Sequence, residues 1–369
     1  MKTLLCASLA MLSFAADGLA QRTIDLRAET PVSIAEPFTH IAGVRSLAGN
    51  RVIVTDQVER RVFLADFGTG SRRQLGREGG GPGEYRFPMA PVAGSDGTTW
   101  ILDAVLRRVL SISAEGNIGA SLPAPYNAVR GGLIAARGVD RAGRIYFEGN
   151  SFDGETGRFS DSVSVVRWDP GKDQPEVIAR VWSGGRMRVE REGGPASIAR
   201  SATPFPAVDA WVVLPDGRIA IVQQQPHQLR FTGASGTTTS VVPPTRTIAV
   251  TAAERAAYRA REEGTRMLAA GGGQAMRRPP TPDALFPESM PALIAASVVA
   301  SPEGEIWIGR SFASTERTRR YDVFDDSGRL VAVATLSSDR AVVGFGAGVV
   351  FVARTDPDDH LVYLERFGR

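Results

Sequence analysis

The feature that most constrains the fold of this chain is an internal repeat of strand-forming segments. Each copy contains a turn glycine, a short run of β-branched or aromatic residues, a polar hairpin and a second apolar run. Short apolar runs bounded by Gly, Asp, Asn and Ser are typical of strands and hairpins rather than helices. The six copies start at Gly49, Gly97, Gly143, Gly217, Gly304 and Gly346.

A strand repeat with a period of about 40 to 50 residues is typical of propeller blades. One four-stranded sheet cannot bury both of its faces alone, whereas blades arranged in a ring bury each face against a neighbour. The chain has 369 residues, more than a single ordinary core accommodates, and a modular ring resolves this. The repeat therefore predicts an all-β, six-bladed β-propeller.

The two ends of the chain are expected to close the ring. The last strand, Leu361–Phe367, leaves only two residues after it, so the last blade lacks its outermost strand. The segment Arg22–Arg27 is a spare strand of suitable length. We predict that this N-terminal strand pairs beside the C-terminal strand and so closes the last blade.

Two stretches exceed the repeat spacing, near 184–206 and 245–292. The second contains strong helix formers after Thr251, a suitable N-cap, and precedes the helix-breaking Gly271–Gly273. We expect a short helical insertion between blades four and five. It is either a solvated insertion, the interpretation that we favour, or a lid over the channel mouth.

The N-terminus has the pattern of a secretory signal peptide over residues 1–20. Lys2 precedes an apolar run, and Gly18–Ala20 supplies small residues for cleavage. The run is shorter than the ~20 residues that span a membrane. We expect export to the periplasm or exterior, and a single monomeric domain over 21–369. Cys6, the only cysteine, lies in the removed segment, which leaves no disulfide and no thiol nucleophile.

The formal net charge is +3, and nearly all of the positive charge is carried by arginine, because Lys2 and Lys172 are the only lysines. The arginines are interspersed with as many acids, which favours a solvated mixed-charge surface over a dedicated anion or nucleic-acid site. RNA binding is a third functional hypothesis, and export argues against it.

One stretch carries a family resemblance. Gly76–Pro88, followed by Asp96–Gly97, Trp100–Asp103 and Arg108–Val109, resembles the NHL-repeat family and its bacterial six-bladed relatives. The resemblance covers residues 41–124 and implies a Gly-Pro-Gly connector between blades. Later copies depart from the pattern, with Glu148 and Gln223 near the position of the Asp. Propellers host binding modules, lyases and lactonases alike, so the resemblance implies a fold and leaves the function open.

The glycine-rich and charged motifs are interpreted as structural. Gly79–Gly83 is followed by a strand and not by a helix, which favours an interblade turn over a phosphate cradle. The pairs Asp56/Arg61 and Asp103/Arg108 recur at the same hairpin of two blades. We expect each carboxylate to cap the turn and each guanidinium to fork back onto it.

No catalytic, cofactor-binding or metal-binding residue is predicted. His40, His227 and His360 lack zinc spacing, although they could converge on one mouth of the ring. Glu36-Pro37 partly matches the opening acid motif of lactonase-type propellers, which hold a hard cation. The acidic cluster Asp356, Asp358 and Asp359 is interpreted as a solvated hairpin turn, and no Gly-x-Ser-x-Gly elbow occurs.

Two functional hypotheses follow. The first is a non-catalytic module that binds an unknown envelope or extracellular ligand or protein over one face of the ring. The alternative is a metal-dependent hydrolase or lyase, lactonase-like, with its site in the central channel. That alternative requires three or four acidic or Asn side chains from different blades to converge in the channel.

Overall fold

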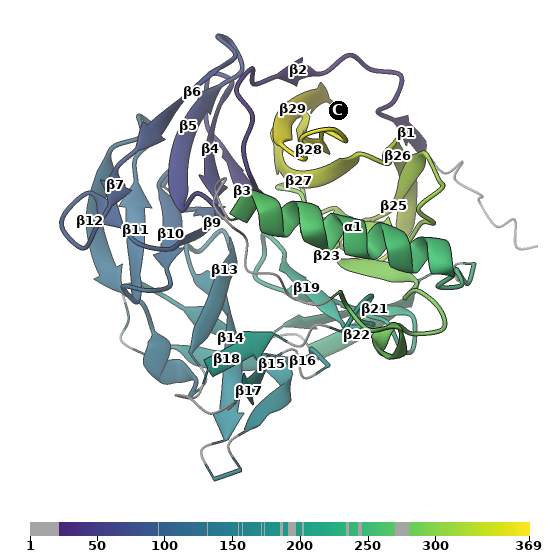
Figure 1. Ribbon diagram of the computed structural model, residues 1–369. Coiled ribbons are helices and arrows are strands. Elements are labelled where there is room, and N and C mark those ends of the chain that lie inside the picture. The colour runs from purple at the N-terminus through teal and green to yellow at the C-terminus, as the bar shows by residue number, and fades with distance from the viewer. Residues whose placement is uncertain are drawn as a thin grey trace, which may run out of the picture.

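A computed structural model describes residues 22–369, apart from residues 95, 131, 154, 157, 171, 173, 185–186, 191–196, 201–202, 234–235, 243–245 and 270–279. The predicted signal segment and the glycines at 271–273 lie outside the described residues. The described chain forms six antiparallel sheets around one axis (Figure 1). The predicted all-β six-bladed propeller is confirmed.

Each blade is built on three or four strands that follow one another in the chain, with the first of them innermost (Figure 1). Blades one to three are β3 (Ile41–Ser46), β4 (Arg51–Asp56), β5 (Arg61–Asp66) and β6 (Ser71–Leu75); β9 (Pro88–Ala93), β10 (Thr99–Asp103), β11 (Arg108–Ile112) and β12 (Ile118–Pro123); and β13 (Leu133–Val139), β14 (Ile145–Asp153), β15 (Arg158–Trp168) and β16 (Glu176–Trp182).

Blades four to six are β19 (Ala210–Val213), β20 (Ile219–Gln223), β21 (Gln228–Gly233) and β22 (Gly236–Val241); β23 (Leu293–Ala300), β24 (Ile306–Arg310), β25 (Thr318–Phe324) and β26 (Leu330–Ser337); and β27 (Arg340–Gly346), β28 (Val349–Thr355) and β29 (Val362–Gly368). A hairpin of β17 (Met187–Glu190) and β18 (Ser197–Arg200) follows blade three. It occupies the first stretch that exceeded the repeat spacing.

The hydrophobic core lies between the blades. Between blades one and two, Tyr85 is fully buried among residues of both sheets. Its hydroxyl donates to the Leu75 carbonyl at 2.6 Å and accepts from the Val62 amide at 3.1 Å. Near the axis the inner strands approach so closely that a Cβ on Gly43 would lie 2.9 Å from that of Ala90. Small residues on the inner strands therefore let the ring close tightly.

The N-terminal segment closes the last blade, as predicted, but Arg22–Arg27 does not lie beside the C-terminal strand. Strand β2 (Val32–Ser33) pairs antiparallel with β29 and supplies the fourth strand of blade six. Strand β1 (Arg22–Asp25) instead pairs parallel with β26 as a fifth strand of blade five. We call residues 22–33 the strap, because this segment binds the outer strands of two blades.

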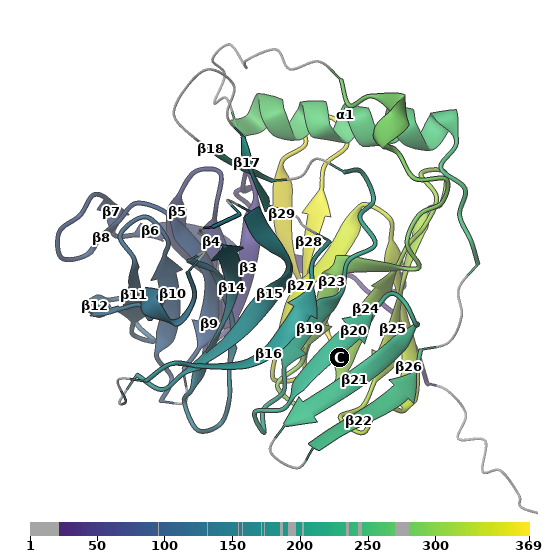
Figure 2. The same ribbon diagram turned by 90° about the horizontal axis from the view of Figure 1, so that it is seen from below.

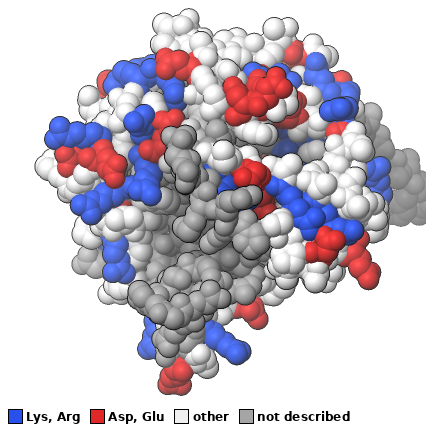
Figure 3. Space-filling view, in the orientation of Figure 1, with Lys and Arg blue, Asp and Glu red and all other residues white. Residues whose placement is uncertain are grey.

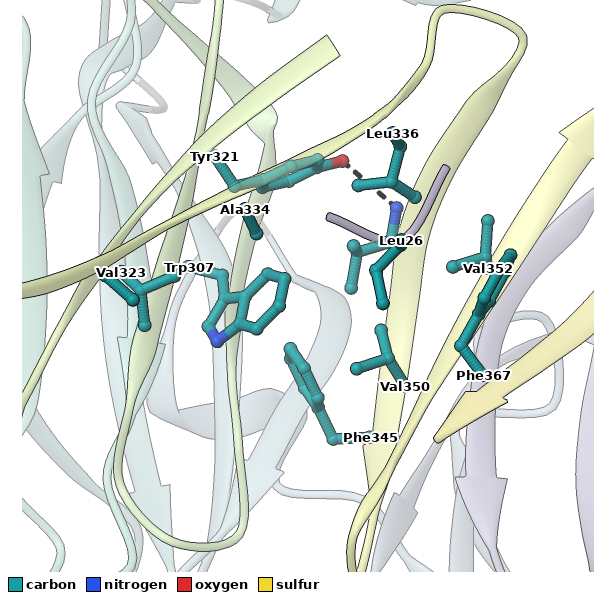
Figure 4. Packing of buried hydrophobic residues seen from close by; sticks show 12 residues of the cluster. Leu26, Trp307, Tyr321, Val323, Ala334, Leu336, Phe345, Val350, Val352 and Phe367 are labelled. Atoms are coloured by element: carbon teal, nitrogen blue, oxygen red, sulfur yellow. Dashed lines mark hydrogen bonds between the residues drawn. The ribbon is translucent and has the colours of Figure 1, made fainter. Parts of the chain in front are cut away.

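Leu26 anchors the strap in the core between blades five and six. Its side chain is 2% exposed and packs in a cluster with Trp307, Phe345 and Phe367 (Figure 4). Its amide donates to the Thr335 carbonyl at 3.0 Å. The strap is thus held by side-chain burial as well as by strand pairing.

The glycine-rich loop is the predicted connection between blades one and two. It carries two short parallel strands, β7 (Arg77–Glu78) and β8 (Glu84–Tyr85). Gly79 and Gly83 have φ angles of 156° and 72°, which disfavour other residues. The Glu84 carboxylate accepts a hydrogen bond from the Gly81 amide at 2.7 Å.

The two aspartates cap their turns as predicted, but the arginines do not fork back onto them. Each carboxylate is fully buried and accepts from four backbone amides. Asp103 binds the amides of Arg86 and Phe87, before β9, and those of Val105 and Leu106 in its own hairpin. Asp56 does the same with Thr39, His40, Val58 and Glu59.

The arginines find other partners because these carboxylates are saturated by backbone donors. Arg61 donates to the Glu59 carboxylate at 3.1 Å, and Arg108 donates to the Glu84 carbonyl at 2.7 Å. The expected Asp–Arg fork is therefore wrong at both hairpins.

Candidate functional site

The two faces of the ring differ in the length of their connections. On one face, the turns between the first and second strands of five blades share the same backbone hydrogen bond, donated by Leu47, Gly94, Asp140, Leu214 and Ser301. The opposite face carries the connection before β9, the β17–β18 hairpin and the described part of the insertion between blades four and five. We call the first the turn face and the second the mouth face.

The insertion forms α1 (Ala252–Ala269) between blades four and five, as predicted. The helix lies flat across the mouth face and crosses the ring (Figures 1 and 2). It begins at the predicted cap, because the Thr251 hydroxyl accepts from the Glu254 amide at 3.4 Å. This position is the one expected of a lid over the channel mouth, the alternative that we did not favour from the sequence.

Polar contacts hold the N-terminal half of α1 against the ring. The buried Glu254 carboxylate accepts from the Ser314 amide at 2.9 Å and from the Ser314 hydroxyl at 2.9 Å. Arg259 donates to the Thr281 carbonyl at 2.6 Å. Glu254 thus joins the helix to the hairpin between the second and third strands of blade five.

An aromatic group lies beneath this half of the helix. Tyr258 packs against Phe205 and Phe286, with ring centroids 5.2 Å and 5.4 Å away. Burial raises the pKa of the Tyr258 hydroxyl, and the nearby Glu262 carboxylate raises it further. The group joins the segment before blade four to the segment before blade five.

The C-terminal half of α1 rests on blade six. A Cβ on Gly264 would lie 2.9 Å from Cδ2 of His360, so a larger side chain there would have to displace the His360 imidazole. His360 lies in the turn between β28 and β29 and has a φ of 61°. A larger residue at position 264 would therefore fit only if the His360 side chain moved.

All three histidines lie on the mouth face, in different blades. The sequence had left open whether they would share one face of the ring. His40 precedes β3, His227 lies between β20 and β21, and His360 lies under α1. Desolvation lowers the pKa of His40, and the charge of Asp56 opposes this effect. Among the described residues, no group of three or more His, Cys, Asp or Glu is placed to hold a metal ion.

The other acidic candidates have local partners. Glu36 lies 3.6 Å from Nε of Arg72 on the outer strand β6, away from the channel. Asp356 accepts from the Asp358 amide at 3.0 Å, and Asp359 accepts from the Leu361 amide at 2.8 Å, in the last hairpin turn. These contacts cap turns, and the innermost strands of the six blades contain no Asp, Glu or Asn.

The inner strands supply the wall of the channel, and their charge is entirely positive. Strands β3, β9, β13, β19, β23 and β27 contain three arginines, Arg45, Arg137 and Arg340, and no acidic residue. Arg340 is held by the buried Glu365 carboxylate at 2.6 Å and 3.1 Å. The sequence did not indicate this pattern, because the innermost strand of each blade is defined only by the sheet order.

Arg137 is held in place by neighbouring side chains. Its Nε and Nη2 donate to one oxygen of Glu148 at 3.0 Å and 2.6 Å, and Trp211 Nε1 of blade four donates to the same oxygen at 3.2 Å. The Glu148 side chain is 7% exposed, whereas that of Arg137 is 44% exposed. A buried carboxylate thus orients a guanidinium that remains open to solvent. Glu148 is the residue at which the third copy departs from the repeat.

The surface charges of the mouth face are mixed. Figure 3 shows basic and acidic side chains interspersed over the described part of this face, as the sequence predicted. Many of them form ion pairs, such as Arg259 with Asp283. No helix in the described part of the chain has the length and apolar character needed to cross a membrane.

Comparisons with known proteins support the fold alone. No family model and no curated protein matches the sequence. A candidate exported protein from Bacteroides fragilis has a similar structure, with a TM-score of 0.50 and 9% identity over 94% of this chain and 98% of its own. A member of the DUF4221 family from Bacteroides vulgatus has a TM-score of 0.50 and 8% identity over 95% and 100% of the two chains.

The comparison of structures also found an enzyme. A gluconolactonase from Xanthomonas campestris has a TM-score of 0.48 and 10% identity over 91% of this chain and 94% of its own.

Proposed function

We propose that this protein is an exported, non-catalytic binding module whose ligand or partner is bound on the mouth face. The observation that carries the proposal is the asymmetry of the two faces. Functional residues concentrate on long connections held by a rigid scaffold, and here the long connections, α1 and all three histidines lie on one face.

The buried contacts of α1 support this proposal. A helix that was only a solvated insertion would not need a buried carboxylate bound to Ser314 or a glycine fitted against His360. Burial of a carboxylate is costly unless hydrogen bonds satisfy it. These contacts hold the helix at a defined position over the ring, where it can shape a binding surface.

The experiment is site-specific photocrosslinking of the full-length protein in its native host. A photoreactive amino acid replaces Val105 or Met267, whose side chains are 54% exposed on the mouth face. The matched control places the same group at Asp326, which is 63% exposed on the turn face. We expect one defined adduct from the first two positions and none from the third.

Equal labelling from both faces, or no adduct from the mouth face, would contradict the proposal. Hydrolysis of lactones by the metal-loaded protein would instead support the enzymatic alternative.

A further inference from the structure

We propose that strand β22, the outer edge of blade four, is a self-association surface at which two copies of this chain pair antiparallel about a twofold axis. The inference goes beyond the proposed function, because β22 lies on the rim of the ring and not on its mouth face (Figure 2). It also departs from the monomer expected from the sequence, because the outer edges of the blades are defined only by the sheet order.

The chain itself shows how the outer edges of this ring are covered. Strand β1 adds to the edge of blade five, and β2 adds to the edge of blade six. An open sheet edge presents unpaired N–H and C=O groups, and a further strand satisfies them. Blades one to four end at β6, β12, β16 and β22, and no strand of the described chain is added to these four edges.

Three of the four open edges carry features that discourage pairing with another chain. Strand β6 contains the adjacent arginines Arg72 and Arg73. Strand β12 contains Pro123, and its register with β11 is shifted. Strand β16 contains Glu176 and Arg180, and its register with β15 is shifted as well. Charge, proline and an irregular register each hinder the formation of a regular ladder.

Strand β22 has none of these features. Its six residues, Gly236–Val241, pair with β21 in unbroken register and include neither a charged residue nor a proline. The three consecutive threonines Thr237–Thr239 are β-branched and favour an extended strand. Every residue of the strand except Ser240 is exposed. The edge is therefore regular, accessible and suited to the addition of a strand.

The composition of β22 favours a second copy as that strand. In an antiparallel pair about a twofold axis, the strand faces itself, so any charge that it carried would be repelled by the same charge in the other copy. Strand β22 carries none. In the register centred on Thr239, this threonine faces itself across the axis, and Val241 faces Thr237 of the second copy. Pairs of threonines and of β-branched residues stabilise cross-strand contacts.

Val241 gives this pairing an apolar contact. Its side chain is 79% exposed, the largest value among the exposed large hydrophobic residues of the described chain. Thr237, Thr239 and Val241 share one face of the strand, because side chains alternate. The methyl group of Thr237 in the second copy would therefore cover Val241, and the twofold axis repeats this contact.

The pairing leaves both mouth faces free. The turn between β20 and β21 lies on the mouth face, so β21 runs to the turn face and β22 returns to the mouth face. An antiparallel pair places the mouth end of one β22 beside the turn end of the other. The two rings would thus lie side by side with their mouth faces directed opposite ways.

Sedimentation velocity of the exported protein over a range of concentrations tests the association. We expect a reversible monomer–dimer equilibrium. Thr239→Lys should weaken the dimer by roughly tenfold or more, because two lysines would face each other across the axis. Thr239→Val is the matched control, since it keeps an uncharged β-branched side chain and should still dimerise.

A mixture of two charge variants supplies the rescue. Thr239→Lys and Thr239→Glu should each be monomeric alone and should form a heterodimer when mixed, because opposite charges then face each other. At a concentration where the wild type is monomeric, both variants should melt close to the wild type, since exposed substitutions change stability little. Loss of the dimer is thereby separated from loss of the fold.

A cysteine on the axis reports the register directly. The chain has no cysteine after Cys6, which lies in the predicted signal segment, so Thr239→Cys introduces a single thiol. Directly opposite Cβ atoms in an antiparallel pair are about 4.5–5.5 Å apart, and mild oxidation should link two copies through a disulfide. Ser71→Cys, at the exposed start of β6, is the matched control and should remain monomeric.

A protein that stays monomeric at every concentration would overturn the proposal. A dimer that persists in Thr239→Lys, or equal disulfide linkage from positions 71 and 239, would also overturn it, because the association would then use a surface other than β22.

Discussion

At the scale of single residues, buried aspartates fix the geometry of the first two blades. Asp103 joins its own hairpin to the segment that leads into β9, because four backbone amides share one carboxylate. Removing it would leave several buried donors without a partner. The residue therefore belongs to the framework and not to a site.

We expect Asp103→Ala to lower the free energy of unfolding by about 3 kcal/mol or more, because each orphaned buried donor costs about 1–3 kcal/mol. Denaturant unfolding measures the change. Asp96→Ala is the control, since Asp96 caps an exposed turn of the same blade through the Thr98 amide. Equal losses in the two variants would contradict the structural role of Asp103.

A second residue makes the strap sensitive to acid. Hydrogen bonds from the Arg27 and Thr335 side chains hold the pKa of Asp25 well below its usual range. A carboxyl whose pKa is depressed in the folded state stabilises the fold above its unfolded pKa of about 4, and this contribution is lost as the pH falls below that value.

We therefore expect the melting temperature of the wild type to decrease below about pH 4 more steeply than that of Asp25→Asn. The two proteins are compared in parallel melts from pH 7 downwards. Curves that stay parallel across this range would show that Asp25 does not support the strap.

At the scale of elements, the strap holds the ring closed through Leu26 and two strand pairings. Burial of a leucine in a well-packed core is worth about 2–5 kcal/mol by truncation to alanine. We expect Leu26→Ala to lose this amount, and deletion of residues 22–28 to lose at least as much, with a broader thermal transition.

Leu285→Ala is the matched control, because Leu285 is 47% exposed and its truncation should change stability by less than about 0.5 kcal/mol. An unchanged melting temperature after the deletion would remove the strap as the element that closes the ring.

The elements also show what sequence reasoning can predict. The glycines and apolar runs predicted the blades, and Thr251 predicted the start of α1, because turns and caps depend on a few neighbouring residues. The partner of β1 was assigned wrongly, because the outer strands of blades five and six both had an open edge and no local feature distinguishes them. The overall arrangement of the blades decides which open strand edge a segment pairs with.

The candidate site was even less predictable. The Trp211 indole of blade four donates to Glu148 of blade three, 63 positions earlier, and only the closed ring brings these two residues together. The hairpin arginines show the reverse case. Arg61 lies directly opposite Asp56 in the register, yet backbone amides already occupy that carboxylate.

At the scale of the whole molecule, six similar sheets produce a ring whose two faces differ. The turns of one face repeat a single hydrogen-bonded pattern, whereas the connections of the other have diverged in length and content. The repeat supplies stability in every blade, so each long connection can vary without disturbing the core.

The strap also sets the order in which the molecule can be completed. Asp25 and Thr335, which form one of its contacts, are 310 positions apart. During synthesis the first strand must wait for almost the entire chain before its partner exists, and contacts between such distant segments form slowly. Until then, the strap strands have no partner strands, and unpaired strands of this kind invite aggregation. The first strands to be synthesised are therefore the last to find their place in the ring.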